Sequence, residues 1–250
     1  MKQPDPADLA AAAADEPGDH AKVIEVTTAR LAERPGDDAA HERRARALLA
    51  AGRLEEAERD ATDAVRLDPD EIRYRELLAE IRSRRGAHAD AAAEYGRLAR
   101  NDPRQVAWTL AEAAERLESD DASRAVEAAR RAVRLEPQNF EAQLALARGL
   151  VRLGEAREAL AAAGRATELR PADRSARESL ADALWLADRR VDAFHLLGEL
   201  ARELDGADRA RVTGKARALY LERAGRPGRW VAAILPFFAA ALRRGWVRVR

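Results

Sequence analysis

Residues 64–69 read AVRLDP and residues 132–137 read AVRLEP, so this chain of 250 residues contains nearly the same segment twice. Proline ends both segments, because it lacks the amide hydrogen that a continuing helix needs and disfavours helix in the residue before it. Prolines recur every 34 residues, at Pro35, Pro69, Pro103, Pro137 and Pro171. The segment therefore predicts a helix end that is repeated with a period of 34 residues.

The same period aligns small residues. When units are counted from residue 4, the eighth position is always alanine: Ala11, Ala45, Ala79, Ala113, Ala147 and Ala181. The twentieth position is also small: Val23, Ala57, Ala91, Ala125, Ala159 and Ala193. One small residue per helix is needed where two antiparallel helices cross closely. We therefore expect Ala147→Leu to destabilise the fold more than Ala128→Leu, which lies outside the aligned positions.

A helix break lies between the two aligned positions of each unit. It contains a glycine in four units, Gly18, Gly52, Gly86 and Gly154, and an aspartate in the other two, Asp120 and Asp188. Glycine ends helices at low cost because it accepts a positive φ angle. Each unit is therefore predicted to be a pair of helices, and stacked pairs bury the apolar faces that a single pair leaves exposed.

These features together resemble the tetratricopeptide repeat family. The resemblance covers residues 4–207 as six units: 4–37, 38–71, 72–105, 106–139, 140–173 and 174–207. It implies an all-α fold, a right-handed α-solenoid of antiparallel helix pairs. The residues after the repeats predict a C-terminal helical extension. The sequence departs from the family pattern at the twenty-seventh position, which is normally small, in three units: Arg30, Leu98 and Leu200. Asp205 stands where a sixth proline would fall, so we expect less regular packing in the first and sixth units.

Composition and motifs point away from catalysis. The chain has 44 basic and 44 acidic residues and no cysteine, which excludes disulfides and thiolate metal sites. The four histidines lack the i, i+4 spacing of a helical metal pair: His20, His41, His88 and His195. The sequence also contains no glycine-rich phosphate loop. We predict that the protein is not an enzyme and needs no cofactor or metal.

The resemblance implies a binding function. In this family the first helix of each pair lines a concave groove that receives a peptide or an amphipathic helix of another protein. The corresponding candidate groove residues here are Arg46, Leu49, Arg84, Leu110, Leu117, Leu144, Arg148, Val151, Arg152 and Trp185. The predicted groove is acidic at one end and apolar in the middle, with Arg148 and Arg152 as cationic points. The alternative is that its leucines only pack against neighbouring repeats.

Some family members hold a chaperone's C-terminal carboxylate with Lys at the fifth position and Asn at the ninth. In the second to sixth units the fifth position here is Glu or Leu, so we do not expect this clamp. The expected function is a non-catalytic scaffold or adaptor for protein–protein interaction.

The charge changes sign near the C-terminus. Residues 208–250 carry a net charge of +9, so the preceding residues sum to −9. Residues 208–228 are predicted to be a basic helix followed by a Gly/Pro break. Residues 229–250 contain thirteen consecutive uncharged residues, 230–242, flanked by arginines. Thirteen residues reach only about 20 Å as a helix, which is too short for a bilayer core of about 30 Å.

Two interpretations of residues 229–250 stay open. The segment packs onto the end of the array or onto a second copy of the chain, or it docks to an anionic membrane surface, where apolar side chains enter the lipid boundary and arginines meet headgroups. The residues concerned are Trp230, Ile234, Leu235, Phe237, Phe238, Arg243, Arg244 and Trp246. Nucleic-acid binding would not explain the apolar run. The N-terminus lacks a signal-peptide pattern, so we expect a cytoplasmic protein, alternatively peripheral at the inner face of the membrane.

Overall fold

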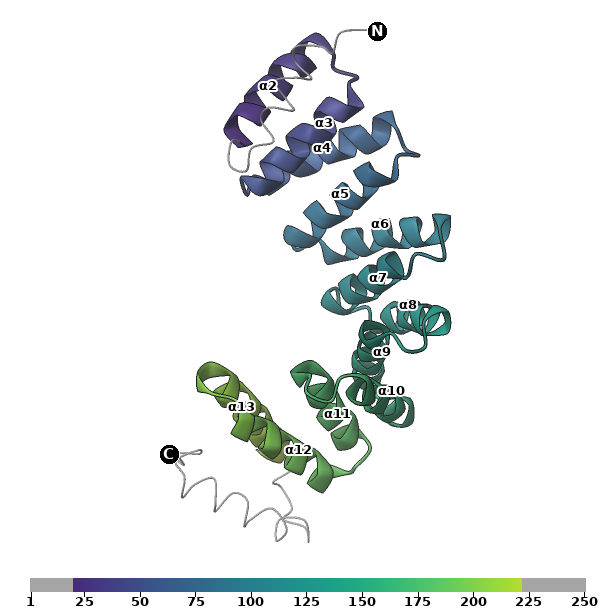
Figure 1. Cartoon of the computed structure of the whole chain (residues 1–250), viewed down its shortest axis with the longest axis vertical. Helices are drawn as coiled ribbons and strands as arrows, with labels where there is room; N and C mark the ends of the chain where they lie inside the picture. The colour runs from purple at the N-terminus through teal and green to yellow at the C-terminus, as the bar shows by residue number, and fades with distance from the viewer. Residues whose placement is uncertain (1–19, 222–250) are drawn as a thin grey trace. The chain divides into compact units, whose positions relative to one another are not determined.

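The computed structural model describes residues 20–221, with side chains up to residue 216, and every regular element in this part is an α-helix (Figure 1). In chain order the helices are α2 (His20–Glu33), α3 (Asp38–Ala50), α4 (Leu54–Leu67), α5 (Ile72–Arg84), α6 (His88–Asn101), α7 (Val106–Glu118), α8 (Ala122–Leu135), α9 (Phe140–Leu153), α10 (Ala156–Leu169), α11 (Arg174–Leu186), α12 (Arg190–Glu203) and α13 (Gly206–Leu221).

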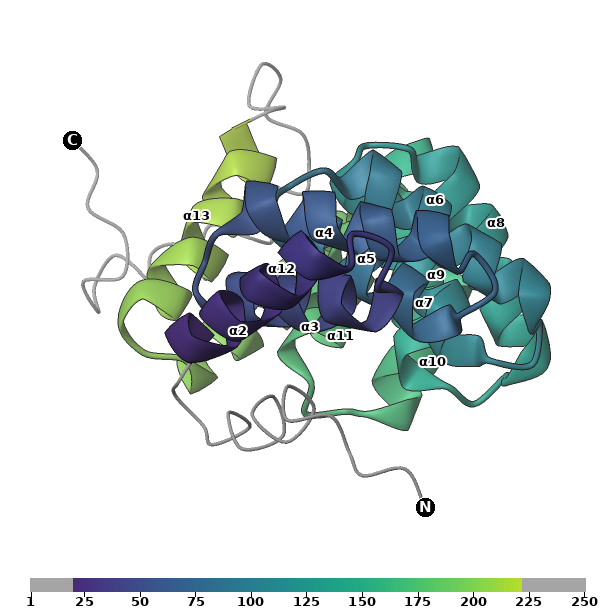
Figure 2. The same cartoon turned by 90° about the horizontal axis from the view of Figure 1, so that it is seen from above.

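The described residues form two compact units, divided between Ala128 and Ala129 inside α8. In the first unit each helix from α2 to α7 packs on the next, and α3 also contacts α5. In the second unit each helix from α9 to α13 packs on the next, and α9 also contacts α11. Figure 2, which looks along the stack, shows α2 to α5 overlying one another. The predicted all-α array of antiparallel helix pairs is confirmed.

The turn inside each pair uses a left-handed residue. Gly52, Gly86 and Gly154 have φ angles of 74°, 80° and 79°. Asp120 and Asp188, at the same place in their repeats, have φ angles of 60° and 61° and are the non-glycine residues with positive φ in the described part of the chain. Aspartate tolerates this conformation better than most residues do. The sequence correctly predicted these five turns.

The junction between pairs combines a helix stop with a helix cap. Asp68 and Asp102, each followed by proline, are extended, with φ of −132° and −130°. The next first helix is then capped in four repeats by the residue at the last position of the preceding repeat, and in one of them Glu71 accepts the backbone N–H of Arg73 at 3.2 Å. The carboxylate or amide oxygens of Asp37, Asn139 and Asp173 accept backbone N–H groups at 2.8, 3.0 and 2.9 Å. Each cap satisfies a donor that the helix start leaves free.

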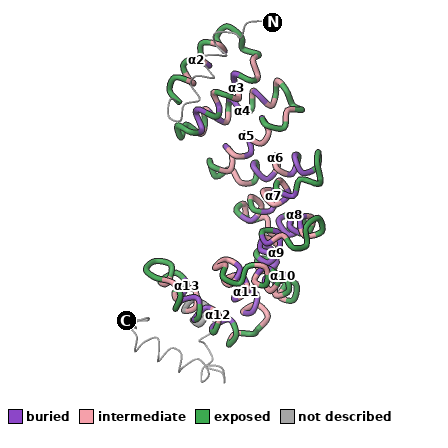
Figure 3. Tube along the Cα trace, in the orientation of Figure 1, coloured by how far each residue is buried: buried purple, intermediate pink, exposed green. Residues whose placement is uncertain are grey.

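The core consists largely of alanine. The aligned alanines in the described residues are at most 1% exposed, which allows the paired helices to approach closely. Figure 3 shows buried positions along the helices of both units. Ala128 is equally inaccessible at 0%, so its expected role as a tolerant site was wrong. It faces the interior because α8 buries a broad alanine face that also includes Ala125, Ala129 and Ala132.

The departures at the twenty-seventh position have local explanations. Leu98 and Leu200 are 0% and 2% exposed, so the larger side chains are accommodated inside the core. Arg30 is only half-buried, and its Nε donates to Asp37 at 2.6 Å. Its guanidinium thus meets the carboxylate that caps α3.

Candidate partner-binding face

Within each unit the first helices of successive pairs lie side by side. We call the surface that they form within a unit the A-helix face of that unit: α3, α5 and α7 in the first unit, and α9, α11 and α13 in the second. Side-chain hydrogen bonds spanning about one repeat connect these helices. Tyr74 Oη donates to Asp38 Oδ2 at 2.7 Å, Trp108 Nε1 donates to Glu76 Oε1 at 2.6 Å, and Lys215 Nζ donates to Asp182 Oδ2 at 2.7 Å. These bonds fix the spacing of neighbouring first helices.

On the first unit, several charged groups of the A-helix face are paired. Arg46 forms an ion pair with Glu42 on α3. On α5, Arg84 forms an ion pair with Glu80 at 2.7 Å. Glu115 of α7 accepts hydrogen bonds from Ser83 Oγ at 2.6 Å and from His88 Nδ1 at 2.8 Å. These charged groups of the face therefore already have counter-charges or donors.

Tyr95 of α6 lies next to this acidic part of the face. Burial raises the pKa of its phenol, and the nearby carboxylates of Glu115, Glu80 and Glu76 raise that pKa further, because a phenolate would be repelled by three negative charges. The hydroxyl therefore stays protonated through the physiological range and can serve as a donor.

On the second unit, α13 lies against α11 through ion pairs. Arg211 pairs with Glu178, Lys215 pairs with Asp182 at 2.7 Å, and Arg174 pairs with Asp208 at 2.7 Å. Burial raises the pKa of Asp182, an effect that the hydrogen bond from Lys215 partly opposes. Val212 of α13 is fully buried within an apolar cluster that includes Leu197, Leu200 and Ala201 of α12. α13 is thus docked within its unit.

Trp185 of α11 is half-buried and held in place. Its ring meets Phe194 edge-on, with centroids 5.7 Å apart and planes at 76°. The guanidinium of Arg190 lies 5.5 Å from the centroid of the indole ring. Such edge and cation contacts orient an aromatic side chain without covering it fully. Trp185 is therefore a preordered apolar group at the end of α11.

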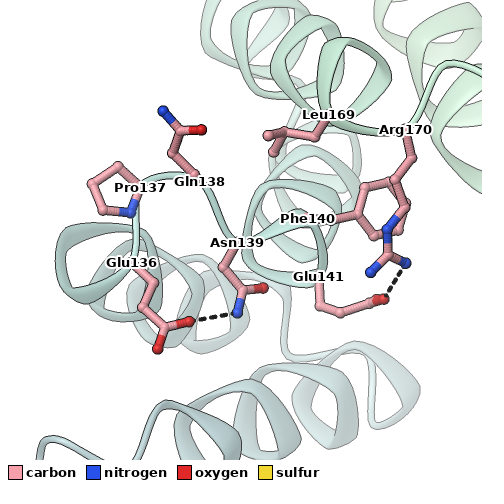
Figure 4. A pocket seen from close by; sticks show the side chains of 8 residues that line it. All are labelled: Glu136, Pro137, Gln138, Asn139, Phe140, Glu141, Leu169 and Arg170. Carbon is pink, nitrogen blue, oxygen red and sulfur yellow. Dashed lines mark hydrogen bonds and ion pairs between the residues drawn. The ribbon is translucent and has the colours of Figure 1, made fainter.

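A separate hollow of about 630 Å³ lies at a junction between repeats (Figure 4). It is lined by Glu136, Pro137, Gln138, Asn139, Phe140, Glu141, Leu169 and Arg170. The Arg170 guanidinium stacks 4.1 Å from the Phe140 ring centroid and donates to Glu141 at 3.1 Å, while Asn139 Nδ2 donates to Glu136 at 2.7 Å. Its charged groups are thus largely paired with each other, and none of the predicted groove residues lines it.

Comparison with known proteins identifies the repeat. Two family models described as tetratricopeptide repeat match residues 16–81 and 144–209. The chain belongs to the tetratricopeptide repeat (TPR) family. No curated protein gave a significant match.

Solved TPR structures share the fold. A tetratricopeptide repeat protein from Parabacteroides merdae ATCC 43184 superposes with a TM-score of 0.68 at 17% identity, over 86% of each chain. MamA from Desulfovibrio magneticus RS-1, solved from its residue 41 to the end, gives 0.60 at 16% identity, over 68% of this chain and 97% of the solved MamA chain. YrrB, described as a TPR protein with an unusual peptide-binding site, gives 0.58 at 16% identity, over 80% of this chain and 98% of YrrB.

The predicted groove residues of the TPR array fall into two groups. Leu49, Leu117 and Leu144 are only 8%, 6% and 4% exposed, so their side chains are covered in the free protein. The others remain half-buried or exposed on the A-helix face: Arg46, Arg84, Leu110, Arg148, Val151, Arg152 and Trp185. The tail residues predicted to contact a membrane or a second copy, from Trp230 to Trp246, lie outside the described residues.

Sequence reasoning missed two buried charges inside the TPR core. Asp60 is 4% exposed and accepts from Arg44 at 2.6 Å and from His41 at 3.0 Å. Glu94 is 2% exposed and accepts from Arg75 at 2.8 Å, with further bonds from Arg82 and Arg97. Both acids occupy the twenty-third position of their repeats. In the same two repeats the fourth position is a possible donor to these acids, His41 or Arg75. This recurrence of an acid and a donor at fixed repeat positions could have predicted the buried pairs from the sequence.

Among the described residues, no cluster of three or more His, Cys, Asp or Glu side chains has a geometry that could hold a metal ion. No helix in that same part of the chain is long and apolar enough to cross a membrane.

Proposed function

We propose that this protein is a non-catalytic scaffold or adaptor that binds a peptide or an amphipathic helix of another protein on its A-helix face. The observation that carries the proposal is the pair of half-buried apolar side chains Val151 and Trp185 on the face of the second unit, which stand among charged residues on two helices in contact, α9 and α11. Apolar side chains surrounded by charged residues suit an amphipathic partner helix, whose apolar face covers the apolar side chains while its polar face stays in solvent. The peptide-binding site for which YrrB is named agrees with this use of the fold.

A matched pair of substitutions tests this proposal. Val151→Arg places a charge on the A-helix face, whereas Val191→Arg places the same charge on α12, where the side chain is already 37% exposed. Proteins cross-linked to the tagged full chain in cells would be quantified by mass spectrometry for the wild type and both variants. We expect Val151→Arg to lose most of the recovered partner and Val191→Arg to retain it.

Equal recovery with both variants would contradict binding on the A-helix face, provided that both proteins show wild-type thermal unfolding. Equal loss with both variants would also contradict it, because the surface of α12 would then matter as much as the face.

A second candidate function is a membrane-recruited assembly factor that uses the same face. The net charge of +9 in residues 208–250, together with the uncharged run 230–242, favours docking to anionic lipid at the inner face of the membrane or to a membrane protein. Each arginine near an anionic surface contributes about 1 kcal/mol of attraction.

Sedimentation with liposomes tests the second candidate. The full chain would be compared with an Arg243→Glu/Arg244→Glu double variant on neutral and anionic vesicles at low and high salt. Binding by the wild type alone, on anionic vesicles and only at low salt, is expected for lipid docking. Absence of wild-type binding would leave a scaffold whose tail packs on the array or on a second copy.

A further inference from the structure

Charged residues on the A-helix face can be compared with the residues at the same repeat position in other repeats. At the fifth and ninth repeat positions, which point toward the predicted groove, nearly every charged side chain has a partner within the chain. Glu42 pairs with Arg46, Glu80 with Arg84, Glu178 with Arg211, and Asp182 with Lys215, while Glu76 accepts from Trp108. Arg148, at the ninth position of α9, is the exception. It is exposed and makes no hydrogen bond or ion pair with any described residue.

The local setting of Arg148 makes this exception more pronounced. Arg152 lies four residues later on the same face of α9 and is also exposed. Like charges at i, i+4 repel and destabilise a helix. Arg152 is in the last turn, where the helix carbonyl end attracts cations, but Arg148 lies a full turn further from that end. Residues 20–221 thus leave the charge of Arg148 without compensation.

Apolar groups lie beside this charge. Val151 of α9 is half-buried, and Trp185 occupies the equivalent repeat position on α11, a helix that contacts α9. Because Arg190 stacks near the indole, the Trp185 ring is not an open platform for a stacked base. Val151 and Trp185 better suit contact with an aliphatic or aromatic side chain. We call Arg148, Val151, Arg152 and Trp185 the Arg148 surface.

We infer that the Arg148 surface binds a segment of a partner protein in which a carboxylate lies next to a large apolar side chain. The carboxylate would accept paired hydrogen bonds from the Arg148 guanidinium, a geometry that arginine provides and lysine does not. The apolar side chain would cover Val151 and Trp185 and exclude water from the ion pair, which strengthens it. This inference rests on the proposed function and specifies the chemistry of the partner.

A peptide selection tests the inference without knowledge of the partner. The full chain is used to select from a library of random twelve-residue peptides fused at their C-terminal ends, so that only side chains supply carboxylates. We expect the wild type to enrich peptides with Asp or Glu next to Leu, Ile, Phe or Trp. Synthetic copies with amidated C-termini should bind Arg148→Glu at least tenfold more weakly than wild type in fluorescence anisotropy.

Arg157→Glu is the matched control. Arg157 is exposed on α10 in the same unit and, like Arg148, makes no interaction with a described residue, so the change in net charge is identical. This control should bind the same peptides within twofold of wild type. Arg148→Lys should recover only part of the lost affinity, because it restores the charge without the paired hydrogen bonds.

The outcomes separate this inference from the proposed function. Peptides enriched without acidic residues, and lost on Val151→Arg, would support binding on the A-helix face and overturn the role of Arg148. Equal weakening by Arg148→Glu and Arg157→Glu would overturn it as well, since only net charge would matter. Displacement of the peptides by single-stranded RNA in an Arg148-dependent manner would reassign the surface to phosphate. Failure to enrich any peptide would count against both proposals.

Discussion

At the scale of single residues, the turn inside each repeat depends on one backbone conformation. Gly154 has φ of 79°, and a β-carbon added to it would meet no other atom within 4 Å, so only conformational strain opposes a larger residue there. Gly164 lies inside α10 with ordinary helical φ and equally open surroundings. The two glycines therefore separate backbone strain from crowding.

Gly154→Ala should destabilise the protein by about 1 kcal/mol, because alanine is strained at positive φ. Gly164→Ala should stabilise it by about 0.5–1 kcal/mol, because alanine is the better helix former. Urea unfolding of both variants measures the two changes. Shifts of the same sign would contradict the explanation based on φ.

The helix crossings depend on single residues in a different way. Ala147→Leu should cost about 1–3 kcal/mol through overpacking, since Ala147 is 0% exposed between closely packed helices. Because Ala128 is also buried, the suitable control is Ala161→Leu on the exposed surface of α10. This control should change stability by less than about 0.5 kcal/mol. Thermal unfolding distinguishes them, and equal effects would show that the register of the crossing is wrong.

At the scale of helices, the repeats differ in how a pair is joined. Two repeats of the first unit carry a buried acid at the twenty-third position, Asp60 and Glu94, bound by arginines. In the other repeats the same position is apolar: Val26, Ala128, Ala162 and Leu196. Breaking a buried ion pair leaves charges without counter-charges, which costs more than removing an apolar contact of similar size.

Glu94→Gln should destabilise the protein by about 3 kcal/mol, because Arg75 and Arg82 would keep their charges beside a neutral amide. Glu168→Gln, which breaks an exposed pair with Arg165, is the control and should cost less than about 1 kcal/mol. Denaturant unfolding at neutral pH compares them. A loss with Glu94→Gln as small as that with Glu168→Gln would contradict a stabilising role for the cluster.

The same carboxylate makes stability depend on pH. Burial alone would raise the pKa of Glu94, but hydrogen bonds from Arg75 and Arg97 outweigh it and hold the pKa below its ordinary value of 4.5. A pKa lower in the folded than in the unfolded state stabilises the fold above the unfolded pKa, and this stabilisation is lost as pH falls through the folded pKa. Unfolding followed between pH 7 and pH 3 should therefore show the wild type and Glu94→Gln converging on acidification. A constant difference between them would contradict this pKa.

At the scale of the whole molecule, stability should be distributed by unit. Among the described residues, each helix is stabilised mainly by contacts with neighbouring helices. Unfolding therefore does not need to be a single cooperative transition. Ile81 in the first unit and Leu150 in the second are 0% and 1% exposed and serve as core probes.

Ile81→Ala and Leu150→Ala should each remove about 2–5 kcal/mol of stability from the unit that contains them. Native-state hydrogen exchange measured by mass spectrometry should show faster exchange in residues 20–128 for Ile81→Ala and in residues 129–221 for Leu150→Ala. Faster exchange spread evenly over both units in either variant would show that the chain unfolds as one body.

The sequence by itself determined the features that act along the chain. The period of 34 residues predicted the helix pairs, and the equivalence of Asp120 and Asp188 to glycines predicted their left-handed turns, because backbone preference at a turn is local. The prolines after Asp68 and Asp102 marked the ends of second helices for the same reason.

Only the tertiary structure decided which side chains remain available to a partner. Leu49, Leu117 and Leu144 share the predicted groove pattern with Leu110 and Val151, but the first three are buried, since burial depends on what the neighbouring helices place above each side chain. Likewise Arg148 and Asp182 occupy the same repeat position, and of these two only Asp182 is paired within the described residues, because α13 brings Lys215 to it. The period specifies the helices, whereas the chemistry of the face depends on contacts between side chains one repeat apart.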